Sequence, residues 1–240
     1  MENEYVKNRH MRNRLLILLV VSTCIAIFGS AAAINVLEPF INISMQHDEE
    51  NLDNDLHNLA SYIDFENSRQ SDIQKIIKIS ERYNKNMPME ERKQIAAEIR
   101  DMSVKYSNLD IDLICATITH ESAKTWDANV VSQAGAMGLM QIMPATGAFL
   151  AQEEGINWTS AKDILFNPIY NIRLGCRYLS GLVTDFELDG GLAAYNGGAK
   201  RAVMWISSGK DMNVLWEETR GYIPAILSLY REYRSRGGIL

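Results

Sequence analysis

Glu121 is the side chain whose type and position best suit acid–base chemistry. It closes an apolar run that follows Asp110, and on a helix it would share a face with Ile114, Thr117 and Ile118. Burial among apolar side chains disfavours the charged form of a carboxyl group and raises its pKa. Such a group can hold a proton near neutral pH, as a general acid must. The competing interpretation is an ordinary helix-end glutamate in solvent, which this helix alone favours.

A second unusual segment, residues 132–146, combines glycines, paired methionines and a glutamine. Gly135 and Gly138 permit tight turns or close backbone approach, and Pro144 can open a helix. Methionines more often fill core gaps than form sites. An ordinary loop has little reason to combine all three residue types, so the segment strengthens the case for a functional site that includes Glu121.

With two further segments, these residues form four ordered motifs that resemble those of the soluble lytic transglycosylase family. The resemblance covers roughly residues 90–235, and residues 171–179 resemble the family's helix between the second and third motifs. One motif alone would be a moderate signal, whereas four in family order are a strong one. The motifs are Glu121-Ser122, residues 138–144 (Gly-Leu-Met-Gln-Ile-Met-Pro), residues 194–198 (Ala-Tyr-Asn-Gly-Gly) and residues 218–223 (Glu-Thr-Arg-Gly-Tyr-Ile).

The resemblance implies an all-α, lysozyme-like catalytic domain that cleaves the β-1,4 MurNAc-GlcNAc bond of peptidoglycan and forms 1,6-anhydroMurNAc. Glu121 would act alone as general acid and base: it protonates the glycosidic oxygen and then accepts the proton of the attacking C6 hydroxyl. A hydrolase normally needs a second carboxylate. Neither the Glu121 motif nor residues 138–144 contain one, although Asp127 is close in sequence. The resemblance implies no cofactor.

Six further residues receive substrate-binding roles by motif position. Tyrosine and asparagine suit a carbohydrate site, because sugars need both flat apolar surfaces and directional hydrogen bonds. Asn196 could instead cap a helix, the hydroxyl of Tyr222 could serve the reacting centre or Glu121, and Glu218 is better explained as a buried structural contact. The six are Ser132 and Gln141, which would hold the sugar, Met140, which would line the cleft, and Tyr195, Asn196 and Tyr222 near the carboxylate.

The chain departs from the family pattern just after Glu121. Two residues near Lys124 and Thr125 lengthen the spacing to Ser132, so the role of Ser132 is less firmly implied than that of Gln141. Trp126 then takes the usual aromatic position. His120 could tune the acid, but a solvent-facing histidine is the favoured interpretation.

Helical periodicity dominates residues 72–236, which we predict to be the catalytic domain, and two-residue alternation is hard to find. Pro88 and Pro168 mark helix starts, and Asp110 is a good N-cap. We expect another helix over residues 192–206, interrupted by Gly197-Gly198, and a last one after Pro224. The predicted buried stripes are Ile73, Ile76, Ile77, Ser80 and Tyr83, and Ile95, Ile99, Met102 and Tyr106.

The N-terminal part of the chain predicts a membrane anchor. Residues 15–37 contain no charged side chain and are long enough to cross the hydrocarbon core. Residues 1–14 carry basic side chains, whereas the acidic residues 38–71 are typical of a stalk or linker, partly helical near Leu52–Tyr62. Basic flanks stay in the cytoplasm. We therefore expect a single-pass signal anchor in the cytoplasmic membrane, with the catalytic domain in the periplasm or another extracytoplasmic space.

Two other interpretations of this segment exist. A cleaved signal peptide could end near residues 30–33 (Ser-Ala-Ala-Ala), although the apolar run is longer than a usual secretory h-region. A lipoprotein site at Cys24 is disfavoured, because Thr23 is a poor preceding residue and the apolar run continues past the cysteine. Both the anchor and the cleaved peptide place the body of the protein outside the cytoplasm.

Composition excludes several other classes. The chain has 240 residues, and 24 Lys+Arg against 30 Asp+Glu give a net charge of -6, so nothing global favours nucleic-acid binding. Three cysteines are too few for a disulfide scaffold, and four scattered histidines suggest no metal site. Whether Cys115 and Cys176 pair or remain separate buried thiols stays open.

Three functions therefore compete. The first is a membrane-anchored lytic transglycosylase, the second a goose-type lysozyme-like hydrolase, and the third a non-catalytic peptidoglycan-binding scaffold of a cell-envelope machine. Glu121 favours an enzyme over a scaffold. The expected partners are peptidoglycan glycan strands and the inner membrane, with a cell-envelope or secretion assembly as a further partner class.

Overall fold

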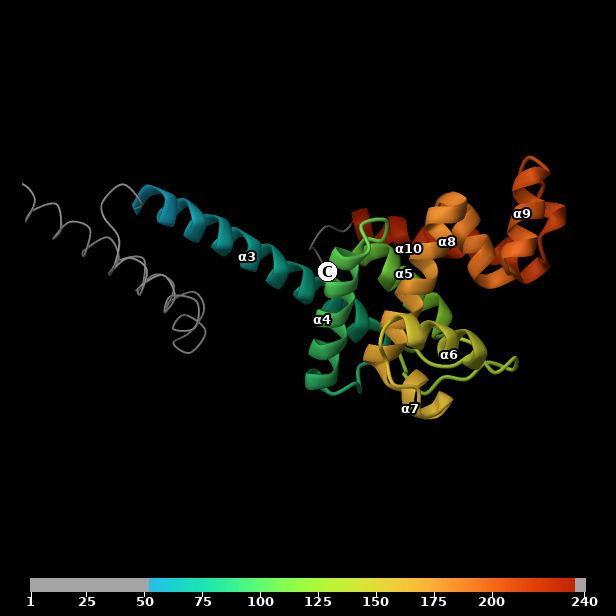
Figure 1. The fold of residues 1–240 in the computed structure, drawn as a ribbon, viewed down its shortest axis with the longest axis horizontal. Helices are drawn as coiled ribbons and strands as arrows, with labels where there is room; N and C mark the ends of the chain where they lie inside the picture. Colours follow the sequence, from blue (N-terminus) through green and yellow to red (C-terminus); the bar gives the residue numbers. More distant parts are fainter. Residues whose placement is uncertain (1–51, 236–240) are drawn as a thin grey trace, which may run out of the picture. The chain divides into compact units, whose positions relative to one another are not determined.

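The computed structural model describes residues 52–235, and nearly all of their regular structure is helical. The chain divides into two compact units, Met1–Glu66 and Asn67–Leu240. Of the first unit the described part belongs to α3, which continues into the second unit (Figure 1). The elements are α3 (Leu52–Tyr83), α4 (Met89–Lys105), α5 (Ile111–Glu121), α6 (Pro144–Glu153), α7 (Ala161–Leu165), α8 (Pro168–Gly197), α9 (Ala199–Ser207), the 3-10 helix η2 (Met212–Val214) and α10 (Glu217–Ser235).

Helix starts follow the predicted capping residues. The side chain of Asp110 accepts the backbone N–H of Leu113 at 2.9 Å and so caps α5. Asn167 likewise caps α8, whose first residue is Pro168. Most members of the predicted stripes are buried: Ile76, Ser80, Ile95 and Ile99 fully, and Ile77 and Met102 nearly so. Ile73, Tyr83 and Tyr106 are only partly buried. Within residues 52–235 the fold is all-α, as expected, apart from two isolated β-bridges.

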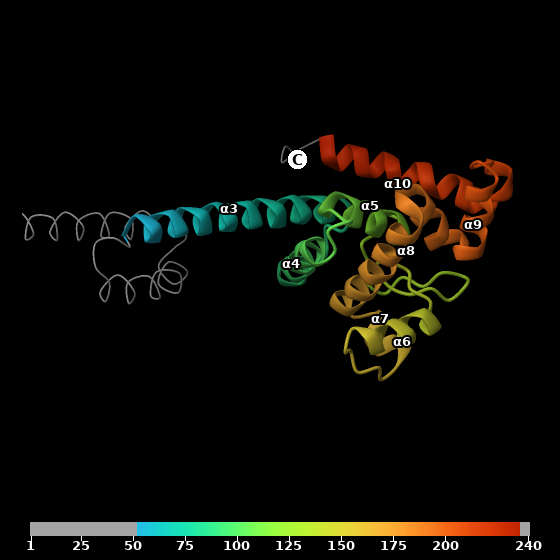
Figure 2. The same ribbon diagram turned by 45° about the horizontal axis from the view of Figure 1, so that its top comes forward.

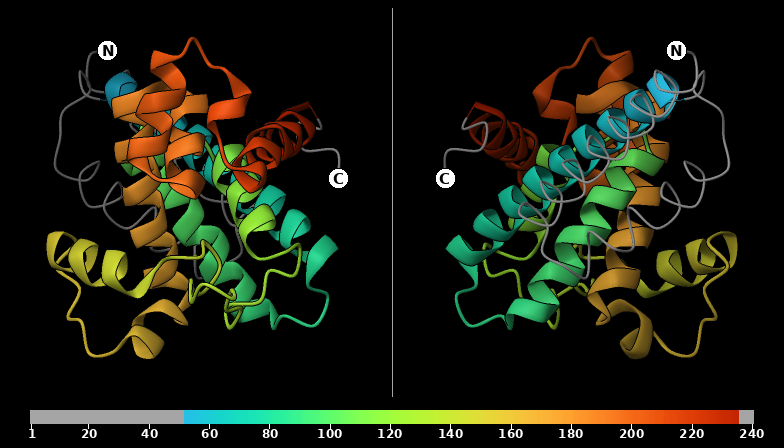
Figure 3. Two further views of the ribbon diagram at one scale, coloured as in Figure 1. Left: turned by 90° about the vertical axis from the view of Figure 1, so that its right-hand side faces the viewer. Right: turned by 90° about the vertical axis from the view of Figure 1, so that its left-hand side faces the viewer.

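Helix α5 lies in the middle of the second unit, where it packs against both α4 and α10 (Figure 2). Helix α8 also contacts α4 and α10 and runs from α6 and α7 at one end of this unit to α9 at the other (Figure 3). Glu121, the last residue of α5, is therefore held by neighbouring helices rather than by a free loop.

Two helix predictions need correction. The helix expected from Leu192 starts a few residues earlier, because α8 is broken at Glu187 (φ 62°, ψ −178°) and residues 188–197 form its second helical part. The predicted glycine break is confirmed, because Gly198 (φ 82°) separates α8 from α9. The last helix begins at Glu217 rather than after Pro224. Two glutamates suit the positive end of α10, and the exposed Pro224 costs one helical hydrogen bond on the solvent side.

A buried chain of hydroxyl groups joins three helices behind the end of α5. Trp126 donates its indole N–H to Thr119 at 2.9 Å, and Tyr233 donates to Tyr83 at 2.9 Å. Thr119 and Tyr233 are 3.0 Å apart, and because the single hydroxyl proton of Tyr233 is already used, Thr119 is the donor. This chain fixes the end of α5 relative to α3 and α10.

The N-terminal predictions fall outside the described residues. The expected membrane-spanning segment, residues 15–37, lies there, as does the first part of the acidic stalk, residues 38–51, whereas residues 52–71 of the stalk belong to α3. Among the helices of residues 52–235, none is long and apolar enough to cross a membrane. The partly helical stretch expected near Leu52–Tyr62 is helix, as the N-terminal part of α3.

Candidate active site

Glu121 lies where α5 stops and the chain makes a tight, irregular turn. Ala123, Lys124 and Trp126 all adopt positive φ angles of 50–61°, which is uncommon for residues other than glycine. The turn is held by Ser122, whose hydroxyl accepts the N–H of Trp126 at 3.0 Å, and by the fully buried Trp126 ring. The extra residues inferred near Lys124 are accommodated in this turn, and the carboxylate stays anchored on the rigid end of a helix.

The carboxylate of Glu121 is held by a tyrosine and not by a cation. Tyr222, which is buried in α10, donates its hydroxyl to Oε1 of Glu121 at 2.5 Å. Burial raises the pKa of Glu121 to about 7, the charge of Glu218 adds to this rise, and the hydrogen bond from Tyr222 opposes it. Glu121 can therefore hold a proton up to near-neutral pH, as a general acid requires.

The role predicted for Glu218 was wrong. It was expected to be a buried structural contact, but its side chain is exposed. Its carboxylate accepts a long hydrogen bond of 3.4 Å from Asn196, and its charge raises the pKa of Glu121. Glu218 meets Asn196 because α10 packs against α8. The residues around Glu218 in the sequence do not indicate this long-range contact.

Asn196 lies at the junction of α8 and α10. Its side-chain oxygen accepts the hydroxyl proton of Thr219 at 2.7 Å. A Cβ atom on Gly197 would come within 2.9 Å of the same hydroxyl, so glycine is required there for the two helices to approach. The structure thus explains the Asn-Gly pair of the third motif as a helix junction that also presents Asn196 beside Glu218.

The loop between α5 and α6 is held mainly by its own hydrogen bonds. Ser132 accepts the N–H of Ala136 at 3.0 Å and closes a turn. Gln141 (φ 48°) donates its side-chain amide to the carbonyls of Val130 and Gly138 at 3.1 and 2.8 Å. Neither residue forms a hydrogen bond with Glu121 in the described part of the chain. The side-chain oxygen of Gln141 remains an acceptor that could meet a ligand.

Asn171 is a buried residue whose role the sequence did not reveal. Its side chain accepts the N–H of Met140 at 2.7 Å and donates to the carbonyls of Met137 and Leu165 at 2.8 and 2.9 Å. A Cβ on Gly138 would lie 2.2 Å from its amide nitrogen. Asn171 therefore ties the glycine-rich loop to α8, and its place in the first turn of a helix gives little hint of this.

Met140 does not line the surface of the site, contrary to expectation. Its side chain is fully buried and packs against Gly175 and Cys176 of α8. A flexible apolar side chain fills an irregular core gap well. The contribution of Met140 toward the site is its backbone carbonyl, which accepts the hydroxyl of Tyr195 at 2.8 Å.

Tyr195 lies between Glu121 and the surface of α8. The charge of Glu121, together with the dominant effect of burial, raises the pKa of Tyr195 well above its usual value. Its ring contacts the ring of Tyr178, with centroids 5.2 Å apart. The structure therefore places Tyr222 against Glu121 and Tyr195 close to it, with Asn196 beside Glu218, while Ser132 and Gln141 support their own loop.

The remaining titratable candidates have smaller roles. His120 is half-buried, and its ring meets that of Tyr222 edge-on at 4.9 Å. Burial lowers the pKa of His120, with a smaller contribution from Lys124, so the ring is neutral at pH 7. Asp127 is exposed and accepts the N–H of Asn129 within its own turn. Cys115 and Cys176 are both buried free thiols, so the question of a disulfide is answered in favour of separate cysteines.

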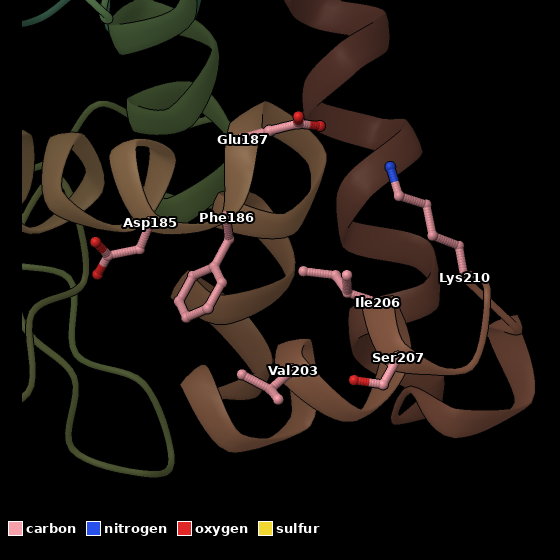
Figure 4. Close-up of a pocket in the computed structure, with 7 residues that line it drawn as sticks. All are labelled: Asp185, Phe186, Glu187, Val203, Ile206, Ser207 and Lys210. Carbon is pink, nitrogen blue, oxygen red and sulfur yellow. The ribbon is translucent and has the colours of Figure 1, made fainter.

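The described residues around Glu121 form no metal cluster. Residues 52–235 contain no group of three or more metal-ligating side chains. A hollow of about 350 Å³ lies between the kink of α8 and α9 and contains none of the predicted site residues. Figure 4 shows Phe186, Val203 and Ile206 turned toward it, while the carboxylate of Asp185 points away.

Comparison with known proteins agrees with this arrangement. Residues 99–214 match the family model described as "Transglycosylase SLT domain". The chain is 30% identical over 157 residues to the soluble lytic murein transglycosylase of Escherichia coli K12, covering 61% of this chain and 24% of that one. It is 32% identical over 127 residues to membrane-bound lytic murein transglycosylase C of Histophilus somni, covering 48% and 34%. The chain thus spans about a quarter to a third of these relatives.

Solved structures give the same result. An inactive glutamate-to-glutamine mutant of the lytic transglycosylase Slt from Pseudomonas aeruginosa matches with a TM-score of 0.52 and 29% identity, over 58% of this chain and 24% of that one. A 70-kDa soluble lytic transglycosylase in complex with bulgecin A matches with a TM-score of 0.50 and 29% identity, over 60% and 26%. Over residues 99–214 this chain is therefore similar to the transglycosylase SLT domain and to the soluble lytic murein transglycosylases.

Proposed function

We propose that this protein is a peptidoglycan lytic transglycosylase in which Glu121 is the single general acid and base. The observation that carries the proposal is the raised pKa of Glu121, about 7, on a carboxyl group held by Tyr222. Protonated Glu121 donates to the glycosidic oxygen, and the C6 hydroxyl of the muramyl sugar attacks its own C1. The resulting Glu121 carboxylate then accepts the hydroxyl proton, which yields the 1,6-anhydro product and restores the acid.

The position of Glu218 favours this reaction over hydrolysis. A hydrolase needs its second carboxylate across the sugar from the acid, as nucleophile or as base for water. Glu218 lies one helical turn from Tyr222 on the same face of α10, hence beside Glu121 rather than opposite it. Glu218 is therefore better placed to adjust the pKa of Glu121 than to activate a water molecule on the far side of the sugar ring.

The proposed site also assigns the binding groups. Tyr195 and Asn196 would contact the sugar next to Glu121, and the free side-chain oxygen of Gln141 would accept a sugar hydroxyl or amide. Ser132 would act through the shape of its loop. The solved relative that was made inactive by a glutamate-to-glutamine mutation supports a glutamate as the essential group.

We further propose that residues 15–37 anchor the chain in the cytoplasmic membrane, with residues 1–14 inside and the catalytic domain outside. The membrane-bound relative in Histophilus somni supports such an attachment. Resistance of the full chain to extraction from membranes at alkaline pH, lost on deletion of residues 15–37, is the expected result. Release of the intact protein by alkali would contradict the anchor. A partner in a cell-envelope or secretion assembly remains a proposal of the same kind.

The reaction is tested by mass spectrometry of muropeptides released from purified peptidoglycan by the full chain in detergent. We expect products with 1,6-anhydro ends from the parent and none from Glu121→Gln. Glu217→Gln is the matched control, because it removes an exposed carboxylate one residue from Glu218. Reducing-end products would establish a hydrolase instead. Binding to the wall without any release would favour the non-catalytic scaffold.

A further inference from the structure

A second hollow of about 350 Å³ opens on the side of α8 that faces α6. Tyr106 at the end of α4 and Leu150 and Glu153 of α6 form part of its lining. The remainder is one face of α8 between Arg177 and Asp185, where the lining residues recur at helical spacing. The hollow is thus built by three helices and not by a loose loop.

This hollow is connected to Glu121 through two tyrosine rings. Tyr178 lines it, and the Tyr178 ring lies 5.2 Å from the ring of Tyr195. Tyr195 in turn hydrogen-bonds the carbonyl of Met140 and lies close enough to Glu121 for that charge to raise its pKa. A lining residue of the hollow is therefore in contact with a tyrosine that lies close to the proposed catalytic carboxyl group.

The lining suits a neutral, hydroxyl-rich ligand. Tyr178 is half-buried and offers part of a flat ring, next to the apolar Leu150 and Leu182. Arg177 is held by two hydrogen bonds from its guanidinium to Glu153, at 2.8 and 2.6 Å. Because Arg177 is already paired and the further lining residue Asp185 is acidic, an anionic ligand is disfavoured, whereas sugar hydroxyls can bond to the outer atoms of the pair without separating it.

We propose that this hollow binds sugar rings of the same glycan strand at a distance from the bond cleaved at Glu121. The inference rests on the proposed function, because it takes a polymer of sugars as the substrate. A polymer continues beyond the cleaved bond, and binding energy from its remote rings can position the reacting sugar. The hollow would thus favour long strands over short fragments.

Gly181 provides a way to fill the hollow without touching the proposed site. It lies in the middle of α8, is exposed and lines the hollow, and no heavy atom lies within 4 Å of an added Cβ. Gly181→Phe would place a ring in the hollow. Gly181→Ala is the matched control, since it adds only a methyl group and removes the helix cost of glycine.

The experiment measures kcat/KM of the full chain on long glycan strands freed of stem peptides and on the shortest fragment that is still cleaved. We expect Gly181→Phe to lower kcat/KM about tenfold on long strands, which is about 1.4 kcal/mol, and to leave the shortest fragment unaffected. Gly181→Ala should match the parent. Ser207→Phe, which fills the hollow of Figure 4 instead, should also match it.

The other possible results of this experiment test different parts of the proposal. Equal rates for Gly181→Phe and the parent on long strands would overturn the sugar site while leaving the proposed reaction intact. An effect seen only when stem peptides are present would replace the sugar site by a peptide site. Equal losses in Gly181→Phe and Ser207→Phe would show that the hollow has no specific role. Failure of the parent to form anhydro products would instead overturn the proposed function itself.

Discussion

Two carboxylates of the same domain have opposite surroundings. Glu98 on α4 is 6% exposed and receives two hydrogen bonds from the Arg173 guanidinium, at 2.6 and 3.0 Å. Glu121 on α5 receives one hydrogen bond from a neutral tyrosine and lies near a like charge. The first carboxylate joins α4 to α8 through an ion pair, whereas the second lies where burial and a nearby like charge favour its protonated form. The first arrangement stabilises the fold, whereas the second lowers stability and leaves Glu121 able to hold the proton that the proposed reaction needs.

The largest expected effect is a gain in stability from Glu121→Gln. The pKa of Glu121 is about 7 in the folded chain, against 4.5 for an unperturbed glutamate. The folded state therefore binds more protons between these pH values, and stability falls as pH rises from 4.5 to 7. Above pH 7 the full cost is about 3 kcal/mol. Urea unfolding should show Glu121→Gln more stable than the parent by that order at pH 8 and nearly equal at pH 4. An equal difference at both pH values would contradict the buried acid.

The next largest expected effect is a loss of stability in Arg173→Met. Arg173→Met leaves the charge of Glu98 without its partner, and we expect the free energy of unfolding to fall by about 2 kcal/mol. The loss is smaller than for a fully enclosed pair, because Arg173 itself reaches solvent. Lys210→Met, which breaks an exposed pair with Asp189, is the control and should leave the unfolding midpoint unchanged. Unchanged stability in Arg173→Met would remove the contrast between the two carboxylates.

Tyr222→Phe should weaken catalysis and shift its pH dependence. The hydrogen bond from Tyr222 lowers the pKa of Glu121, so its loss raises that pKa further and moves the alkaline limb of kcat/KM upward. The carboxylate formed during the reaction also loses its donor, which should reduce the rate about tenfold. A pH–rate profile measures both effects. A lower rate with an unshifted limb would mean that Tyr222 only maintains packing.

Glu218→Gln should give the smallest effect, a shift of the alkaline limb of kcat/KM toward lower pH. Its charge raises the pKa of Glu121, so removing it lowers that pKa and moves the alkaline limb down by a fraction of a pH unit. The effect is small because Glu218 is exposed and water screens it. Glu217→Gln should leave the profile in place, and high salt should reduce the difference between parent and Glu218→Gln. An upward shift would exclude a repulsive role for Glu218.

Local sequence signals predicted local structure well. Asp110 and Pro168 gave the starts of α5 and α8, because capping and proline geometry depend on a few neighbouring residues. The start of α10 was wrong, since Pro224 was treated as a helix start when an exposed proline can also be accommodated inside a helix. The continuous length of α3 was not foreseen either, because its polar N-terminal half carries no strong apolar stripe.

The candidate site required contacts that only the fold provides. The motifs located Glu121, Tyr195, Asn196 and Tyr222, but nothing near Tyr222 in sequence indicates a hydrogen bond across 101 residues. The burial of Met140 depends on the absence of a side chain at Gly175, on another helix. The exposure of Glu218 likewise follows from how α10 meets α8. Local sequence patterns do not indicate which distant helices pack against each other.

The bond between Tyr222 and Glu121 also sets an order of events during synthesis. The carboxyl group and its hydroxyl donor are 101 positions apart, and the donor lies on the last helix described, α10. A growing polypeptide therefore carries the proposed acid long before the residue that holds it has been made. Chains interrupted before α10 contain Glu121 but cannot assemble its surroundings. If Glu121 acts as proposed, the protein thus becomes competent only once α10 has been made, and we expect unfinished copies to be inert.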